Sequence, residues 1–406
     1  MDMTHLLATR AGDGKPFIFP GPDQPITFNF DQGLASTETF PMEDMARLTQ
    51  ELFQNDGSDV LDYFDPSVGY EELVFGSRGL RNALAQRYGA KHGRSDFTAD
   101  NFILTSGSVQ AISLAASACL EQGDVAIVEA ATFPYAVNYM KSAGAEVISV
   151  PVDQDGMNMD ALEAVLDECR RDGKRVKLVY TISTFQMPTG VVLSLPRRHR
   201  LLDLAAAHDF LIHEDYVYGE MRYEGEEIPS LLSLDDSGRV IHDNSLSKTL
   251  APGLRIGWMA GDPSLINAMG AVRQDLGVSQ WMARLAQRYI EDGLLDAHLE
   301  KANALYHRKR DAVVQALNSH CGDYVSFDIP QGSFYIWVEV DQRVDWLRAA
   351  ELAVDAGIYF RPGERFDTAD DSRQFIRIAF ARVSFETIEK GIKKLGEILR
   401  DCEKGD

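Results

Sequence analysis

The run SLSKTLAPGLRIGW, residues 245 to 258, carries more information about fold and chemistry than the rest of the chain. It places Lys248 three residues after Ser245 and seven before Arg255, in a loop fixed by a proline and a glycine. A lysine amine there can form an imine with an aldehyde, while a nearby hydroxyl and guanidinium can hold a dianionic phosphate. Because a lone lysine is usually a solvated surface charge, this interpretation depends on the surrounding block.

The block resembles the S-x-S-K and P-G-L-R-x-G-W signature of the class I and II aminotransferases of fold type I, over fourteen consecutive residues. The resemblance implies pyridoxal 5'-phosphate as the cofactor, with Lys248 bonded to its aldehyde and with Ser245 and Arg255 at its phosphate. It also implies the α/β architecture of fold-type I enzymes. In that fold a large domain with a seven-stranded, mostly parallel sheet carries a smaller α+β domain.

Size and composition favour a cytoplasmic enzyme. A chain of 406 residues predicts a large domain with a smaller companion. The net charge of -22 repels nucleic acid and anionic membranes, so neither is expected as a partner. The four cysteines and nine histidines lack the spacing of disulfide frameworks or metal sites. We see no signal peptide and no apolar run of membrane-spanning length.

Short apolar, β-rich runs alternate with helical stretches, a pattern typical of a mostly parallel sheet. Ligands of such sheets bind at the carboxyl ends of the strands. We expect residues 61–320 to form the large cofactor-binding domain and residues 321–406 the small domain, with residues 1–60 packing on the latter. The seven runs begin at Asn101, Asp124, Glu146, Val176, Phe210, Arg239 and Ile256.

The stretch HEDYVYGEMRY, residues 213 to 223, ends one of these runs. A pyridine ring that is to withdraw electrons needs a carboxylate at its nitrogen. Asp215 fits that role, and Tyr218 could reach the phenolic oxygen of the ring. The spacing resembles the family's E-D-D-P-Y-G-E-L, although Tyr216 and Val217 depart from it. Alone, an acidic residue after a strand is more often a helix N-cap.

Two further motifs follow predicted strands. TSGSVQA, from residue 105, resembles the family's S-G-S-Q-Q phosphate-binding turn, with Gly107 allowing close approach and Ser108 adding a hydroxyl. A plain serine cap is the local alternative. EAATFPYAV, from residue 129, resembles E-x-P-T-Y-P-G and puts Phe133 where an aromatic ring stacks on the pyridine. Otherwise Phe133 is a core aromatic.

Substrate recognition is expected at Arg377, in FIRIAFARVS, because a charge within an apolar strand is costly unless it binds an anion. By resemblance to the family's I-R-x-x-F motif, Arg377 would clamp the α-carboxylate of an amino acid, beside Gly33 of FNFDQGLAS. Three more arginines on the small-domain side could meet an acidic side chain, but we expect them to be solvated. They are Arg361, Arg365 and Arg382.

Tyr63 in LDYFDPS resembles a tyrosine that reaches the cofactor phosphate of the neighbouring subunit. That likeness implies a homodimer with a shared active site. The residues after it follow the family less closely, with an insertion before Gly79.

Met187 in TFQMPTG stands where the family's F-Q-N-P-x-G has an asparagine that bonds the phenolic oxygen and the substrate carboxylate. A thioether donates no hydrogen bond and accepts weakly. The leading interpretation is an aminotransferase that converts an amino acid to a 2-oxo acid, with a second oxo acid as acceptor. The alternative, which Met187 favours, is elimination, replacement, decarboxylation, cyclisation or oxidation with the same cofactor. A regulatory module would carry a basic helix-turn-helix segment that residues 1–60 do not resemble.

Overall fold

The computed structural model describes residues 4–6, 24–368 and 374–404. The seven predicted runs all form strands of one sheet, in the order β2-β10-β9-β8-β7-β3-β4. Its pairings are parallel apart from those of β10, which is antiparallel to both β2 and β9. The predicted seven-stranded, mostly parallel sheet is therefore confirmed. Its strands are β2 (Phe102–Thr105), β3 (Val125–Glu129), β4 (Glu146–Val150), β7 (Val176–Thr181), β8 (Leu211–Asp215), β9 (Val240–Ser245) and β10 (Gly257–Ala260).

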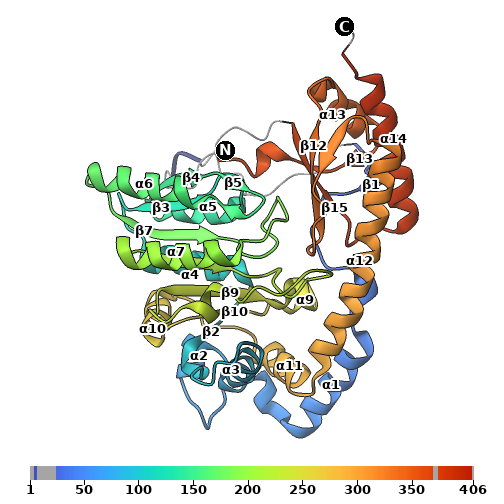
Figure 1. The fold of residues 1–406 in the computed structure, drawn as a ribbon. Helices are drawn as coiled ribbons and strands as arrows, with labels where there is room; N and C mark the ends of the chain where they lie inside the picture. Colours follow the sequence, from blue (N-terminus) through green and yellow to red (C-terminus); the bar gives the residue numbers. More distant parts are fainter. Residues whose placement is uncertain (1–3, 7–23, 369–373, 405–406) are drawn as a thin grey trace.

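Two groups of helices enclose the sheet (Figure 1). α4 packs with α5 and α10, whereas α7 packs with α6 and α8. Strands covered on both faces need apolar side chains on both, which explains their continuous rather than alternating apolar runs. The six helices are α4 (Ser108–Cys119), α5 (Pro134–Ser142), α6 (Met159–Arg171), α7 (Leu195–His208), α8 (Leu231–Leu234) and α10 (Pro263–Val272).

The long helix α12 (Leu294–His320) joins two hydrophobic cores and runs along one side of the molecule (Figure 1). Its first half packs into the large core through Leu299, and its second half packs into a smaller core through Val313 and Leu317. The smaller core covers a four-stranded sheet, β11-β12-β15-β14. The strands of this sheet and the two helices that pack with it are β11 (Val325–Phe327), β12 (Tyr335–Val340), α13 (Trp346–Asp355), β14 (Arg361–Pro362), β15 (Phe375–Ala379) and α14 (Phe385–Asp401).

The described chain from residue 24 to residue 60 is divided between the two cores, and residues 1–3 and 7–23 of the expected N-terminal segment lie outside the described residues. β1 (Phe28–Asn29) pairs in parallel with β13 (Ile358–Tyr359) of the small domain, where we expected residues 1–60 to pack. In contrast, α1 (Met42–Asn55) packs against α11 (Gln280–Glu291) and joins the large core. The chain between β1 and α1 therefore crosses from one domain to the other. Among the described residues, no helix combines the length and apolar composition needed to cross a membrane.

Candidate active site

One edge of the large sheet gathers the loops that carry the predicted functional residues. The carboxyl ends of β2, β3, β7, β8 and β9 lie there, because these strands run in the same direction. β10 runs the opposite way, so its beginning lies at the same edge. This reversal explains why Arg255, which precedes β10, joins residues that follow the other strands.

A cavity of about 290 Å³ lies at this edge. It is closed on the other side by residues of the small domain and of the segment after β1. The structure brings ten of the twelve predicted site residues together around it: Gly33, Gly107, Ser108, Phe133, Met187, Asp215, Tyr218, Lys248, Arg255 and Arg377.

Ser245 and Tyr63 lie elsewhere. Ser245 is buried and caps the one-turn helix α9 (Leu246–Thr249), where its Oγ accepts a hydrogen bond from the Ser247 amide at 3.1 Å. Ser247, whose hydroxyl accepts a hydrogen bond from that of Ser245 at 2.9 Å, lines the cavity, and the role of Ser245 at the cofactor phosphate stays a prediction. Tyr63 is 65 % exposed and does not line the cavity of its own chain, so its role toward a second subunit stays a prediction.

Lys248, in α9, lines the cavity. Its Nζ donates a hydrogen bond to the carbonyl oxygen of Gly33, 2.6 Å away, and lies 5.4 Å from the centre of the Tyr218 ring. Leu246 and Thr249 are buried beneath the helix and fix its orientation. The amine is thus held inside the ligand space rather than in solvent.

Asp215, the last residue of β8, is 2 % exposed. The Tyr180 hydroxyl donates to its Oδ2 at 2.7 Å, and the Val217 amide donates to its Oδ1 at 3.2 Å. Burial, and after it the nearby carboxyl of Asp243, raises the pKa of Asp215 to about 7. A cation placed against this carboxyl would offset the cost of ionising it. A protonated pyridine nitrogen is such a cation.

Behind Asp215, its register partner Asp243 on β9 contacts His213 with 2.6 Å between Oδ2 and Nε2. Burial lowers the pKa of His213 to about 4 and raises that of Asp243 well above its usual value. The protein therefore supplies little positive charge behind Asp215, and a ligand in the cavity must provide it.

The opposite end of the cavity is suited to an anion. Gly107 has a φ of +86° and precedes α4, whose first residue is Ser108. A Cβ at Gly107 would lie 2.9 Å from Nη2 of Arg255, so glycine is needed for the guanidinium to approach. Ser108 at the start of α4, Ser247 and Arg255 all line the cavity, and Nη2 of Arg255 donates to the Ser106 carbonyl at 2.6 Å. Together they form the donor set that binds phosphate groups, and they fit the phosphate of the implied cofactor.

Arg377 on β15 supplies the positive charge near the small domain and is 7 % exposed. Its Nη2 donates to the Asp31 carbonyl at 2.5 Å, its Nη1 lies 3.5 Å from Sδ of Met187, and its Nε has no partner among the described residues. Burial lowers its pKa below the usual arginine value, yet the group stays charged at neutral pH. Its nearest carboxylate oxygen, Oδ1 of Asp31, is 3.7 Å from Nη2, so this buried guanidinium is prepared to bind a further carboxylate.

Arg361 departs from our expectation that it is solvated. It is 7 % exposed, lines the cavity and forms a double ion pair with Asp31, with 2.6 Å from Nε to Oδ1 and 2.5 Å from Nη2 to Oδ2. Arg365 is exposed, as expected, and Arg382 is half-buried. Asp31 and Arg361 are 330 residues apart, so no local sequence signal could have paired them. The lining residues that sequence reasoning missed are Leu34, Val109, Pro134, Ile182, Val217, Ser247, Pro252, Arg361 and Phe366.

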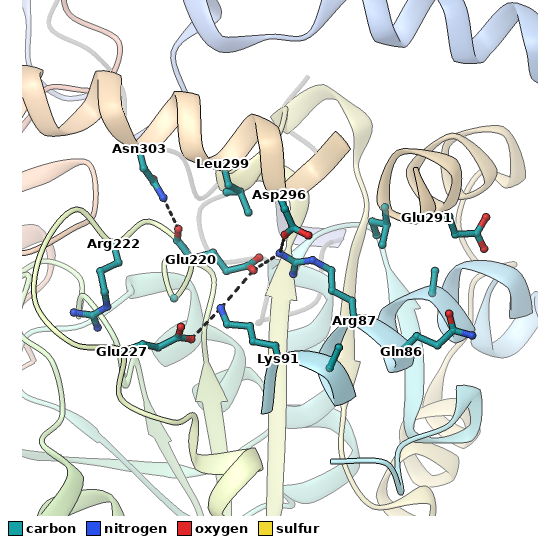
Figure 2. A pocket seen from close by; sticks show the side chains of 14 residues that line it. Gln86, Arg87, Lys91, Glu220, Arg222, Glu227, Glu291, Asp296, Leu299 and Asn303 are labelled. Atoms are coloured by element: carbon teal, nitrogen blue, oxygen red, sulfur yellow. Dashed lines mark hydrogen bonds and ion pairs between the residues drawn. The ribbon is translucent and has the colours of Figure 1, made fainter. Parts of the chain in front are cut away.

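A second cavity, of about 710 Å³, lies behind the loop that follows Tyr218, and its lining includes none of the twelve predicted residues. Figure 2 shows Arg87 between Glu220 and Asp296, each 2.6 Å away. Burial opposes ionisation of Glu220, but Arg87 and Lys91 outweigh it and lower its pKa. These charges satisfy one another, so the network ties α3 (Arg78–His92) to α12 and to the Tyr218 loop.

Comparison with known proteins agrees with this geometry. Residues 29–395 match the family Aminotransferase class I and II. The chain is 37 % identical, over 91 % of its length and 87 % of the relative's, to aromatic-amino-acid aminotransferase 1 of Thermococcus litoralis. Kynurenine aminotransferase of Pyrococcus horikoshii superposes with a TM-score of 0.90 at 33 % identity, over 98 % of both chains.

A further neighbour, at 26 % identity and a TM-score of 0.86 over 99 % of both chains, is the α-aminoadipate aminotransferase LysN of Thermus thermophilus. Its structure was determined as a complex with N-(5'-phosphopyridoxyl)-L-leucine. The match to the family spans most of the chain and both of its domains. The chain belongs to the class I and II aminotransferases.

Proposed function

We propose that the cavity residues hold pyridoxal 5'-phosphate together with an α-amino acid, and that the enzyme passes the amino group to a 2-oxo acid. The protein is a pyridoxal-phosphate-dependent enzyme of the aminotransferase type. The observation that carries the proposal is the position of Lys248, whose Nζ lies inside a cavity with an anion-binding end and, elsewhere in its wall, Arg377.

The cofactor, when bound, supplies an electron sink that allows the Cα–H bond of an amino acid to be broken. In the proposed arrangement Gly107, Ser108 and Arg255 hold its phosphate. Asp215 holds the proton on its ring nitrogen, because that proton gives the buried carboxylate the positive partner it lacks. Tyr218 donates to the phenolic oxygen, and Phe133 packs on the ring.

Arg377 holds the α-carboxylate of the substrate beside Gly33, and so fixes which bond at Cα stands perpendicular to the ring. Lys248 Nζ then takes the proton from Cα and later returns it. Its present bond to the Gly33 carbonyl has to break before it can do so. The apolar side chains of Ile182, Val217 and Phe366 surround this space and limit the access of water.

A homodimer is part of the proposal. Four large apolar or aromatic side chains are strongly exposed near the beginning of α2 (Glu71–Phe75) and before α11. Monomeric proteins rarely expose such groups in one region, so a second copy of the chain is the proposed cover. The four are Leu61, Tyr63, Tyr70 and Leu276, at 69 %, 65 %, 76 % and 62 % exposure.

A cytoplasmic location is proposed because all four cysteines are free thiols.

The test is to incubate the purified protein with a panel of amino acids, with and without a 2-oxo acid acceptor, while following the cofactor absorbance and the products. We expect sustained formation of the new 2-oxo acid only with the acceptor, in equal amount to the new amino acid. Sustained turnover without an acceptor, with release of ammonia or carbon dioxide, would instead support the non-transaminating alternative that Met187 suggested.

A further inference from the structure

Two arginines stand directly opposite one another at the substrate end of the cavity. Arg361 on β14 and Arg377 on β15 are register partners in an antiparallel pair, so their side chains project from the same face of the small sheet. Both are 7 % exposed and both line the cavity. Like charges placed directly opposite destabilise a sheet, and burial increases that cost, so the pair needs a counter-ion.

Asp31 is a counter-ion of both arginines, but it is shared unequally. Its carboxylate holds Arg361 through two short bonds of 2.6 and 2.5 Å, whereas its nearest oxygen is 3.7 Å from Nη2 of Arg377. Asp31 therefore engages the Nε and Nη2 donors of Arg361 and leaves Arg377 bonded, among the described residues, only to a backbone carbonyl and a thioether. The cluster of one carboxylate and two guanidiniums has a net charge of one positive unit, which a single substrate carboxylate neutralises.

We propose that Asp31 determines the substrate class: by occupying Arg361 it restricts the enzyme to amino acids and 2-oxo acids with a single carboxylate. This inference rests on the proposed function, because it assumes that Arg377 binds the α-carboxylate. A second carboxylate on the substrate would meet the negative charge of Asp31 instead of an available guanidinium. The apolar lining of the cavity includes Leu34, Ile182 and Phe366, which match an aliphatic or aromatic side chain.

The charge count makes a definite prediction about variants. Asp31→Asn keeps the size of the side chain and removes its charge, so that the cluster gains a second positive unit and Arg361 can bind a second carboxylate. Arg361→Gln leaves Asp31 and Arg377 to neutralise each other, so substrate binding should weaken for every amino acid. In the double variant Asp31→Asn/Arg361→Gln the single positive unit returns, and with it the original preference.

The experiment measures kcat/KM of the first half-reaction, by cofactor absorbance and without any acceptor, for phenylalanine, leucine, glutamate and aspartate. The unaltered enzyme should favour the neutral pair. Asp31→Asn should raise the ratio of glutamate to phenylalanine by about tenfold or more, as one charge-assisted hydrogen bond allows. The double variant should return the ratio to within about threefold of the starting value. Arg365→Gln, which makes the charge change of Arg361→Gln at an exposed position four residues along the chain, should leave the ratio unaltered.

The ratio is insensitive to the fraction of active enzyme, so partial misfolding of a variant does not imitate the effect. An unaltered enzyme that favours glutamate or aspartate over phenylalanine and leucine would overturn the inference even if no variant folds. A cofactor-loaded Asp31→Asn enzyme with an unaltered ratio would overturn it as well. If the unaltered enzyme reacts neither with these four amino acids nor with any member of the wider panel, the proposed function fails and the inference fails with it.

Discussion

The phenol of Tyr180 donates a hydrogen bond to Asp215, with 2.7 Å between its Oη and the carboxylate Oδ2, beneath the floor of the cavity. Both side chains are almost completely buried, so this bond and the Val217 amide are the main protein donors that stabilise the ionised carboxylate. The strength with which Asp215 can hold a proton on the cofactor ring therefore depends on a residue of the neighbouring strand.

Tyr180→Phe should slow the half-reaction by about tenfold to a hundredfold, because a hydrogen bond to a charged acceptor is worth about 1.5–3 kcal/mol. Tyr216→Phe is a matched control, since the Tyr216 hydroxyl is buried without a hydrogen-bond partner among the described residues. Single-turnover rates of both variants check the prediction. Equal rates for the two variants would show that the Tyr180 bond does not act on Asp215.

Asp215 should make the stability of the cofactor-free protein depend on pH. Because its pKa rises from a usual value of 3.8 to about 7 on folding, the folded state binds a proton that the unfolded state releases. Below about pH 4 the carboxyl is neutral in both states. As the pH rises from about 4 to about 7, its contribution to the free energy of unfolding falls. Relative to Asp215→Asn, the unaltered apoprotein should therefore become less stable over that interval in urea unfolding. A difference that stays constant with pH contradicts the assignment.

Met187→Asn should strengthen substrate binding more than it changes the rate of chemistry. The sulfur is now 3.5 Å from Nη1 of Arg377 and is a poor partner, whereas an amide adds a directed donor and acceptor beside the carboxylate. We expect KM for the amino acid to fall by about tenfold with kcat changed less. Met187→Leu, which removes the sulfur and adds no hydrogen bond, is the control. If Met187→Asn shifts turnover from another product to transamination, the departure at this position has retuned the reaction.

The proposed dimer should share its active sites. Sedimentation should give about twice the chain mass at micromolar concentration.

A mixed-subunit experiment tests whether the two chains share each site. Tyr63→Ala and Lys248→Ala subunits, each inactive alone, are unfolded and refolded together. The mixture should regain about a quarter of the full activity, because half of the dimers then contain one intact site. A mixture that stays inactive would place Tyr63 outside the partner's site, and a stable, active monomer would contradict the dimer.

The large fold could be read from the sequence because buried parallel strands leave a strong local signal. Each run from Asn101 to Ile256 is continuous, apolar and short, and each became a strand. About half of the cavity lining was also predictable, since Asp215 ends β8 and Lys248 lies three residues after the end of β9. Strand direction alone brings such residues to one edge of the sheet.

The remaining features depend on contacts that no local pattern encodes. The Asp31–Arg361 pair joins two short edge segments from opposite ends of the chain, and it is decided by the packing of β1 on β13. Which of Ser245 and Ser247 lines the cavity depends on the rotation of the single helical turn α9. Tyr180 lies under Asp215 only because of the register between β7 and β8. Each is a product of tertiary structure rather than of sequence spacing.

The most direct test of the central claim is borohydride reduction of the purified, cofactor-loaded protein, followed by peptide mass mapping. Among the described residues Lys248 is the lysine that lines the cavity, so the account predicts loss of the visible absorbance band and a phosphopyridoxyl group fixed on Lys248. Lys248→Ala should retain no such group and should lose turnover by several orders of magnitude. A cofactor fixed on a different lysine, or a Lys248→Ala variant with near-normal turnover, would contradict it.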